Sequence, residues 1–312
     1  MIHPKVLLNE AIYYAPRGEA RLMLLGSIIV QNFLFPSDKL IGVIGDAGAG
    51  KSILIRGMFP GLNLTNDDEG VYRRPLPILD DYERGKFYEF IYHIDVRFEM
   101  AFTPVYILAD AILSALNSGK KVVCEHFELL YPYLRRNADL LIGIGEEVIV
   151  SRPNLFGPEP KEIADTVFLS LGYRLRAHTA EDLVGLVLEE EGYQKIIKGH
   201  GDIKHGFVIN LEEKPMITLK EIERRVKKYM KDSLQVSYVD SQHIKIGEKI
   251  INCTGPRVHV RNTAEIQEFF LFPEYLYSKE DETFLLIGFV DQDEYNKVVK
   301  KQKKEEENND KN

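Results

Sequence analysis

The chain has 312 residues, of which 45% are hydrophobic and 28% charged, and its formal net charge is −8. This length favours two domains, and the balance of apolar and charged residues is that of ordinary globular proteins. The negative charge argues against a protein that coats nucleic acid through many phosphate contacts, although it leaves a local basic face open. Two cysteines are too few for a typical secreted fold held together by disulfides.

The amino-terminal sequence does not have the charged and apolar regions of a signal peptide. The most apolar stretch, Leu22–Phe35, is interrupted by polar residues and is too short to cross a bilayer. We therefore expect a soluble, cytoplasmic protein that does not bind a membrane.

In the first part of the chain, short apolar runs alternate with helical patterns. Helices are predicted at residues 18–34, 52–59 and 105–116. Strands are predicted at Leu40–Ile44, Lys121–Cys124, Leu140–Ile144 and Thr166–Ser170. Alternation of this kind is typical of a parallel sheet with helices on both faces. We expect residues 1–171 to form an α/β domain.

After about residue 172 the pattern becomes that of a smaller α+β domain, which we place at residues 172–291. Its predicted elements are helices at His178–Glu190 and Thr218–Lys231 and strands at Phe207–Leu211, Ile244–Ile251 and Phe284–Val290. Thr218 and Glu221 have the spacing of a capping box. Residues 292–312 have few apolar side chains, which predicts a frayed helix or a disordered tail.

The segment Gly45-Asp46-Ala47-Gly48-Ala49-Gly50-Lys51-Ser52 fits the P-loop pattern G-x-x-x-x-G-K-[ST] at every specified position. In such a loop, glycines let the backbone amides turn toward the phosphates, Lys51 reaches the β and γ phosphates, and Ser52 ligates Mg²⁺. The predicted strand before the loop and helix after it support this interpretation. It predicts bound ATP or GTP with Mg²⁺, and the alternative is a glycine-rich loop of an unrelated α/β domain.

Acidic residues at two places in the sequence are candidates to take part in catalysis beside this loop. The N-K-x-D pattern with which GTPases recognise the base was not found, so kinases are the closer comparison. Asp67 and Asp68 either orient an attacking hydroxyl or form a turn before Gly70. Glu125 follows an apolar strand, where a carboxylate can support Mg²⁺. Together with Lys51, these three acids are the predicted catalytic residues.

Residues 122–144, VVCEHFELLYPYLRRNADLLIGI, resemble the uridine kinase and phosphoribulokinase group, in which a strand runs into a Glu-Gly turn and a second strand follows. The resemblance covers about residues 38–170 and implies phosphoryl transfer from ATP to a small acceptor. It implies that Glu125 lies near Mg²⁺ and that Arg152 is a lid arginine. His126 stands where that group has glycine, and the neighbouring Pro153 makes a structural role for Arg152 the alternative.

Four segments of the second region resemble, in the same order, the second additional domain of alanyl- and threonyl-tRNA synthetases: His178–Asp182, Gly206–Asn210, Thr218–Met230 and His259–Ile266. The resemblance covers about residues 177–290 and implies a domain that hydrolyses mischarged aminoacyl-tRNA. It also implies a zinc site whose ligands are His178, Asp182, Cys253 and His259. Two departures are that Asp182 replaces a histidine and that five residues instead of three separate Cys253 from His259.

These candidate ligands have structural alternatives. If Thr179 is a helix N-cap, Asp182 falls at the third helical position, where a carboxylate favours the helix start. Cys253 can be an ordinary buried thiol. His200 and His205 are substitute ligands or loop residues. A basic face, which can meet tRNA phosphates or solvent, is formed by Arg224, Arg225, Lys227, Lys228 and Lys231.

Three functional hypotheses follow. The first is an ATP-dependent phosphotransferase or ATPase that acts on a small-molecule acceptor. The second is an aminoacyl-tRNA hydrolase or tRNA-binding module controlled by the nucleotide, without the aminoacylation core of a complete ligase. The third is a nucleotide sensor that catalyses no reaction.

Overall fold

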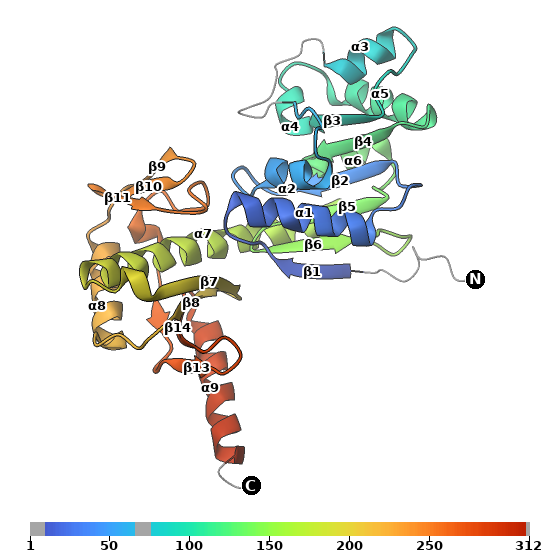
Figure 1. The fold of residues 1–312 in the computed structure, drawn as a ribbon. Coiled ribbons are helices and arrows are strands. Elements are labelled where there is room, and N and C mark those ends of the chain that lie inside the picture. Colours follow the sequence, from blue (N-terminus) through green and yellow to red (C-terminus); the bar gives the residue numbers. More distant parts are fainter. Residues whose placement is uncertain (1–9, 66–75, 310–312) are drawn as a thin grey trace. The chain divides into compact units, whose positions relative to one another are not determined.

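The computed structural model describes residues 10–65 and 76–309 (Figure 1). The chain divides into two compact units, Met1–Leu171 and Gly172–Asn312. Each unit has a hydrophobic core of its own. Among the described helices, none combines the length and the apolar character that crossing a membrane requires.

The first unit contains a six-stranded sheet with helices on both faces (Figure 1). Its elements are β1 (Glu10–Tyr14), α1 (Glu19–Phe33), β2 (Leu40–Ile44), α2 (Lys51–Met58), α3 (Pro77–Glu83), β3 (Ile91–Asp95), α4 (Val96–Glu99), α5 (Val105–Asn117), β4 (Lys121–Glu125), α6 (Phe127–Leu134), β5 (Leu140–Ile144), β6 (Glu147–Ser151) and the first turns of α7 (Pro160–Glu190). The predicted strands at β2, β4 and β5 and the predicted helices at α1, α2 and α5 are confirmed.

The sheet is mixed, with the strand order β1-β6-β5-β2-β4-β3. Strands β5, β2, β4 and β3 are parallel, as predicted, whereas β6 and β1 are antiparallel to their neighbours. The prediction of a parallel sheet is therefore wrong at this edge. The physical reason is the short turn at Gly145 and Glu146 between β5 and β6, because a turn of this length can join only antiparallel strands.

Both faces of the central strand β2 are covered, and all five of its residues are buried. The aromatic ring of Phe127 on α6 packs so closely on Gly42 that a Cβ there would lie 2.7 Å from the ring. On the other face, α1 lies against α2 (Figure 1). This packing holds the carboxyl end of β2, and the loop that follows it, in a fixed place.

The predicted strand Thr166–Ser170 is wrong, because these residues lie inside helix α7. Ile163, Ala164, Val167 and Leu171 are buried, and this spacing of three or four residues is that of one helical face. The β-branched and aromatic residues of the short segment suggested a strand, but the surrounding apolar spacing favours the helix.

The second unit contains a five-stranded antiparallel sheet, a three-stranded antiparallel sheet and the helices beside them. After α7, its elements are η2 (Gln194–Ile196), β7 (Ile197–Ile203), β8 (Gly206–Leu211), α8 (Leu219–Lys231), β9 (Val236–Asp240), β10 (His243–Ile246), β11 (Lys249–Asn252), η3 (Thr263–Glu265), β12 (Phe270–Leu271), β13 (Leu276–Ser278), β14 (Thr283–Phe289) and α9 (Gln292–Asn309). The protein is thus an α/β protein with a mixed sheet and separate antiparallel sheets.

Several predictions for this unit are confirmed and one is corrected. Thr218 caps α8, since its hydroxyl accepts a hydrogen bond of 3.2 Å from the Glu221 amide. The predicted strand Ile244–Ile251 is instead a hairpin of β10 and β11, because Gly247 has φ 58° and turns the chain. The tail forms α9, and the ring of Tyr295 stacks on Phe270 with 5.1 Å between their centroids.

Candidate functional site

The Gly45–Ser52 segment forms the connection between β2 and α2 and the first turn of that helix. Gly48 and Gly50 have φ angles of 80° and 97°, the left-handed region that side chains disfavour. A Cβ at Gly50 would also lie 2.5 Å from Leu22 Cδ2. The left-handed backbone therefore favours glycine at the last loop position, and a side chain there would also displace Leu22.

Lys51 is the first residue of α2, and only 7% of it is exposed. Its Nζ donates a hydrogen bond of 3.1 Å to the carbonyl oxygen of Asp46 and lies 3.7 Å from Glu125 Oε2. A buried ammonium group needs such partners, because leaving it without them would cost several kcal/mol. The ammonium group is thereby held across the mouth of the loop.

Glu125 is the last residue of β4 and lies beside the end of β2, since the two strands are parallel and Val43 is its Cα partner. Ser52 Oγ donates a hydrogen bond of 3.1 Å to Glu125 Oε1. Hydroxyl and carboxylate oxygens are the ligands that Mg²⁺ prefers. The two oxygen donors side by side therefore fit a magnesium ion.

The imidazole of His93 on β3 gives Glu125 a further partner, with 3.2 Å between His93 Nε2 and Glu125 Oε1. Burial raises the pKa of Glu125, but the hydrogen bond from His93, the charge of Lys51 and the hydrogen bond from Ser52 lower it. The net effect is a pKa below the ordinary value for glutamate. Glu125 is thus held as a carboxylate beside the loop.

His126 follows Glu125 at the turn into α6 and has φ 55° and ψ 44°, the left-handed conformation. A glycine adopts this conformation without strain, whereas a residue with a side chain adopts it less readily. Its Nδ1 lies 3.4 Å from Glu128 Oε1. His126 therefore occupies a backbone conformation that favours glycine.

Asp95, which the sequence predictions missed, ends β3 and is the Cα partner of Glu125. Its Oδ1 accepts a hydrogen bond of 3.0 Å from the Phe98 amide at the start of α4. The signal that could have found it is the same as for Glu125, an apolar strand that ends in an acid. Asp67 and Asp68, which were predicted to orient an attacking hydroxyl or to form a turn, lie outside the described residues.

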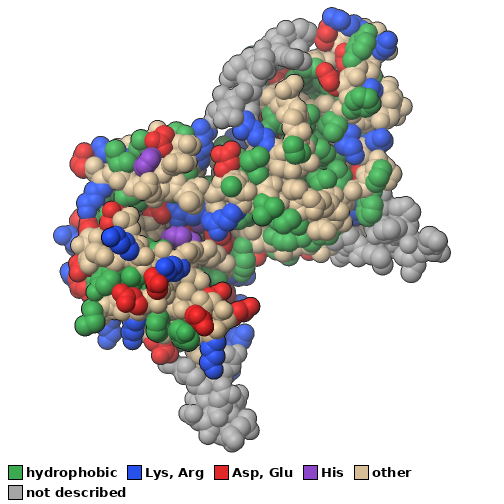
Figure 2. Space-filling view, viewed as in Figure 1, with side chains coloured by type: hydrophobic (Ala, Val, Ile, Leu, Met, Phe, Trp, Pro, Cys, Tyr) green, Lys and Arg blue, Asp and Glu red, His purple; other side chains and the backbone are tan. Residues whose placement is uncertain are grey.

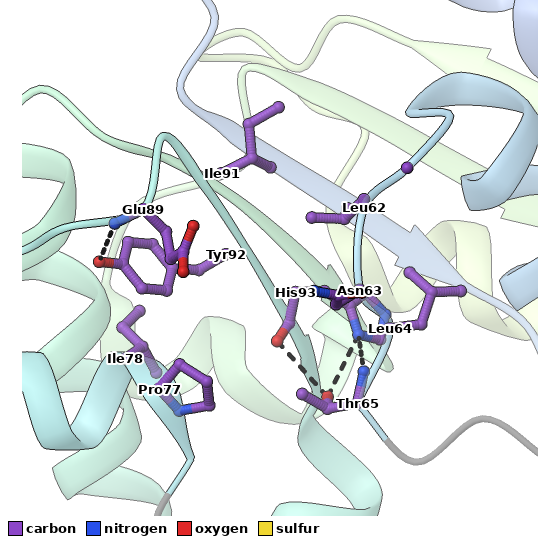
Figure 3. Close-up of a pocket in the computed structure, with 11 residues that line it drawn as sticks. Leu62, Asn63, Leu64, Thr65, Pro77, Ile78, Glu89, Ile91, Tyr92 and His93 are labelled. Atoms are coloured by element: carbon purple, nitrogen blue, oxygen red, sulfur yellow. Dashed lines mark hydrogen bonds between the residues drawn. The ribbon is translucent and has the colours of Figure 1, made fainter. Parts of the chain in front are cut away.

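A pocket of about 120 Å³ lies beside β3, between the segment 61–65 and the start of α3 (Figure 3). Its walls include Leu64, Thr65, Ile78, Glu89 and His93. In Figure 3, His93 and Thr65 approach each other from two different segments of the wall. The pocket thus shares His93 with the cluster around Glu125.

Arg152, the lid arginine that the resemblance implies, is buried and has the partners of a structural residue, which is the alternative role. Its Nη2 lies 2.6 Å from Asp38 Oδ2, and the guanidinium carbon lies 4.3 Å from the centre of the Phe35 ring. Its Nη1 also donates to the carbonyl oxygen of Asp139 at 3.1 Å. These contacts tie β6 to the segment before β2, which is a structural role.

In the second unit, three of the four predicted zinc ligands come together. His259 Nε2 lies 2.8 Å from Asp182 Oδ2 and 3.7 Å from Cys253 Sγ, and the three ligand atoms lie within 4.8 Å of one another. Both contacts use the same imidazole nitrogen, whereas a Cys-His-Asp relay uses opposite nitrogens. The Gly255 amide also donates to the sulfur at 3.3 Å. Sulfur, nitrogen and oxygen donors that converge in this way fit Zn²⁺.

His178 takes a different partner, since its Nε2 lies 3.0 Å from Asp202 Oδ1 on β7. The alternative in which Thr179 is an N-cap is also wrong, because α7 begins at Pro160. The Thr179 hydroxyl instead donates to the Leu175 carbonyl at 2.8 Å and accepts from the Val260 amide at 3.1 Å. Thr179 thereby connects the backbone at Val260, next to His259, to helix α7, which carries Asp182.

The remaining histidine and basic candidates also have protein partners. His200 Nδ1 lies 2.6 Å from Glu181 Oε1, and the His205 ring stacks on Tyr173 with 3.7 Å between centroids. On α8, Arg224 and Lys227 pair with acidic residues of the same helix, and Arg225 pairs with Glu190 at the end of α7. On the side of the second unit that Figure 2 shows, basic and acidic side chains are interspersed. These ion pairs neutralise part of the positive charge of the basic face that was predicted to contact tRNA or solvent.

No protein-family model and no curated protein matches this chain.

Proposed function

We propose that the Gly45–Ser52 segment is a P-loop and that the first unit binds ATP or GTP with Mg²⁺ and transfers the terminal phosphoryl group to a small acceptor. The observation that carries this proposal is the convergence of Lys51, Ser52 and Glu125 at the carboxyl ends of two adjacent parallel strands. Ligands of open α/β sheets bind at this edge. The amino end of α2 adds its positive dipole there.

Each residue has a role in this proposal. Lys51 binds the β and γ phosphates, and the Ser52 hydroxyl and Glu125 carboxylate hold Mg²⁺, which neutralises the charge of the phosphates. Asp95 orients the acceptor hydroxyl and accepts its proton. The acceptor oxygen forms the new bond to phosphorus as the bond from phosphorus to the β–γ bridging oxygen breaks, and the nucleoside diphosphate leaves.

Phosphoryl transfer is tested by measuring nucleoside diphosphate release and ³¹P NMR spectra with a panel of nucleosides, sugars and other hydroxyl compounds. Lys51→Ala is expected to abolish turnover, because the ammonium group binds the phosphates. Asp95→Asn is expected to lower turnover by about 100-fold or more while nucleotide binding remains, the loss typical of a missing general base. The exposed Lys161 supplies the control, and Lys161→Ala is expected to match the unchanged protein. Turnover of Lys51→Ala at the unchanged rate would contradict the proposal.

A second function is favoured by one observation in the second unit, the convergence of Asp182, Cys253 and His259. We propose that these residues hold Zn²⁺ and leave a fourth position for water, the arrangement of catalytic zinc sites. A zinc ion bound by these residues would supply a water molecule of lowered pKa for attack on an ester. Together with the resemblance to the synthetase domain, this supports hydrolysis of mischarged aminoacyl-tRNA.

The second function is tested by following the deacylation of mischarged alanine- and threonine-family tRNA. We expect the purified chain to shorten the ester lifetime and His259→Ala to restore the lifetime measured without protein. The partly exposed His243 provides a matched substitution outside the cluster. Equal lifetimes with and without the chain would remove this function.

A further inference from the structure

His93 contacts two segments that are far apart in the sequence. It lies in the middle of β3, and its side chain is 1% exposed. On one side, its Nδ1 is 3.0 Å from the backbone nitrogen of Thr65. On the other side, its Nε2 is 3.2 Å from Glu125 Oε1. The imidazole therefore bridges the pocket wall and the carboxylate beside the P-loop.

The Thr65 contact determines which imidazole nitrogen carries the proton. A backbone amide can only donate, so Nδ1 of His93 must accept the hydrogen bond from Thr65. In the neutral ring the proton is then on Nε2, which donates it to Glu125 Oε1. The histidine is thus held as a donor aimed at one oxygen of the carboxylate.

The hydrogen bond from His93 competes with an ion pair between Glu125 and Lys51. Glu125 Oε2 lies 3.7 Å from the Lys51 ammonium, and a closer ion pair would occupy both groups with each other. The hydrogen bonds from His93 and Ser52 both end on Oε1 and hold the carboxylate in place. Lys51 stays available to phosphate as a result, and Glu125 stays available to a cation.

We propose that His93 is a positioning residue that fixes Glu125 for Mg²⁺ and so sets the affinity of the nucleotide site for its metal ion. The inference rests on the proposed nucleotide-binding function. It concerns a residue that touches neither phosphate nor metal in that function. Hydrogen-bond partners of metal-ligating carboxylates typically change metal affinity or activity by about 10–100-fold when they are removed.

The test compares two substitutions at this position. His93→Gln places an amide donor near the site of Nε2, whereas His93→Leu has a similar volume and no donor. Mn²⁺, which replaces Mg²⁺ and is paramagnetic, is titrated into each protein with ADP, and free Mn²⁺ is measured by electron paramagnetic resonance. We expect His93→Leu to weaken Mn²⁺ binding by about 10–100-fold and His93→Gln to stay within a few-fold of the unchanged protein.

A second measurement separates positioning from general damage to the site. Binding of ATP in the presence of a chelator is expected to be the same for all three proteins, because His93 does not contact the phosphates. Equal Mn²⁺ affinity of a folded His93→Leu protein would overturn the inference. If that variant fails to fold, His93→Asn replaces it, since its shorter amide reaches the Thr65 side of the ring but not Glu125. Equal Mn²⁺ affinity of His93→Asn would overturn the inference in the same way.

Failure of the proposed function gives a different result. If the unchanged protein binds neither ATP nor Mn²⁺ with ADP, the proposed function and this inference are both overturned. If the unchanged protein binds both and His93→Leu behaves identically, only the role of His93 is overturned.

Discussion

Ser52 Oγ donates a hydrogen bond of 3.1 Å to Glu125 Oε1, and the two residues are 73 positions apart in the sequence. The contact exists because β2 and β4 are adjacent and parallel, so that their carboxyl ends meet at one edge of the sheet. It brings together two oxygen donors of the kind that Mg²⁺ prefers.

Removing the Ser52 hydroxyl is expected to weaken magnesium-dependent nucleotide binding. Ser52→Ala should lose about 10-fold or more in affinity for ATP with Mg²⁺, since one proposed ligand of the ion disappears. Ser52→Thr should stay near the unchanged protein, because the P-loop pattern accepts either hydroxyl residue. Calorimetric titration with and without Mg²⁺ measures both. Equal losses in the two variants would contradict a role of the hydroxyl.

A side chain at Gly50 is expected to destabilise the fold. Gly50→Ala should lower the free energy of unfolding by more than the roughly 1–2 kcal/mol of a left-handed residue, because the new Cβ also meets Leu22. Gly119 gives a matched control, since its φ is 78° and a Cβ there would have no neighbour within 4 Å. Urea denaturation measures both variants. If Gly119→Ala is destabilised as much as Gly50→Ala, steric contact with Leu22 is not the cause.

Arg152 is expected to contribute to stability rather than to phosphoryl transfer. Arg152→Met should lower the free energy of unfolding by about 3–5 kcal/mol, because the buried carboxylate of Asp38 would lose its positively charged partner. Arg136→Ala removes a half-exposed arginine and should cost about 1 kcal/mol or less. Thermal and urea unfolding measure the difference. Full stability of Arg152→Met together with lost turnover would instead support the lid role.

The first unit illustrates what the sequence could predict. Leu40–Ile44 and Leu140–Ile144 were predicted with the bounds that the structure has, because short apolar runs between turn signals identify buried strands. Thr166–Ser170 failed because periodicity over five residues cannot separate a strand from one face of a long helix. The antiparallel edge was missed because Glu10–Tyr14 and Glu147–Ser151 were not recognised as strands.

The candidate site shows the same limit at the level of side chains. The Gly45–Ser52 loop is contiguous, so its local pattern could be read directly. His93, Asp95 and Glu125 come from two strands, and their closeness depends on the pairing of β3 with β4. In the second unit, His178 and Asp182 lie on one helix as predicted, but the His178 side chain contacts Asp202 on β7 instead of the other predicted ligands.

Measurements of zinc content test whether the zinc ligands are the four residues predicted from the sequence or only the three that converge in the structure. Cys253→Ala and His259→Ala are expected to abolish stoichiometric zinc, because each removes one of three ligands. His178→Ala is expected to retain it, since its Nε2 contacts Asp202. Mass spectrometry of metals after purification without chelators measures the content. Loss of zinc in His178→Ala at unchanged stability would place this histidine among the ligands.

The central claim is that backbone amides and the ammonium group of Lys51 bind a nucleoside triphosphate at the end of β2. The direct test is calorimetric titration of ATP and of GTP, each with Mg²⁺, into the unchanged chain and into Lys51→Ala. We expect saturable binding of at least one triphosphate to the unchanged chain, and a loss of about 10-fold or more in Lys51→Ala, equivalent to about 1.4 kcal/mol. No binding of either triphosphate, or equal binding by both proteins, would contradict the claim.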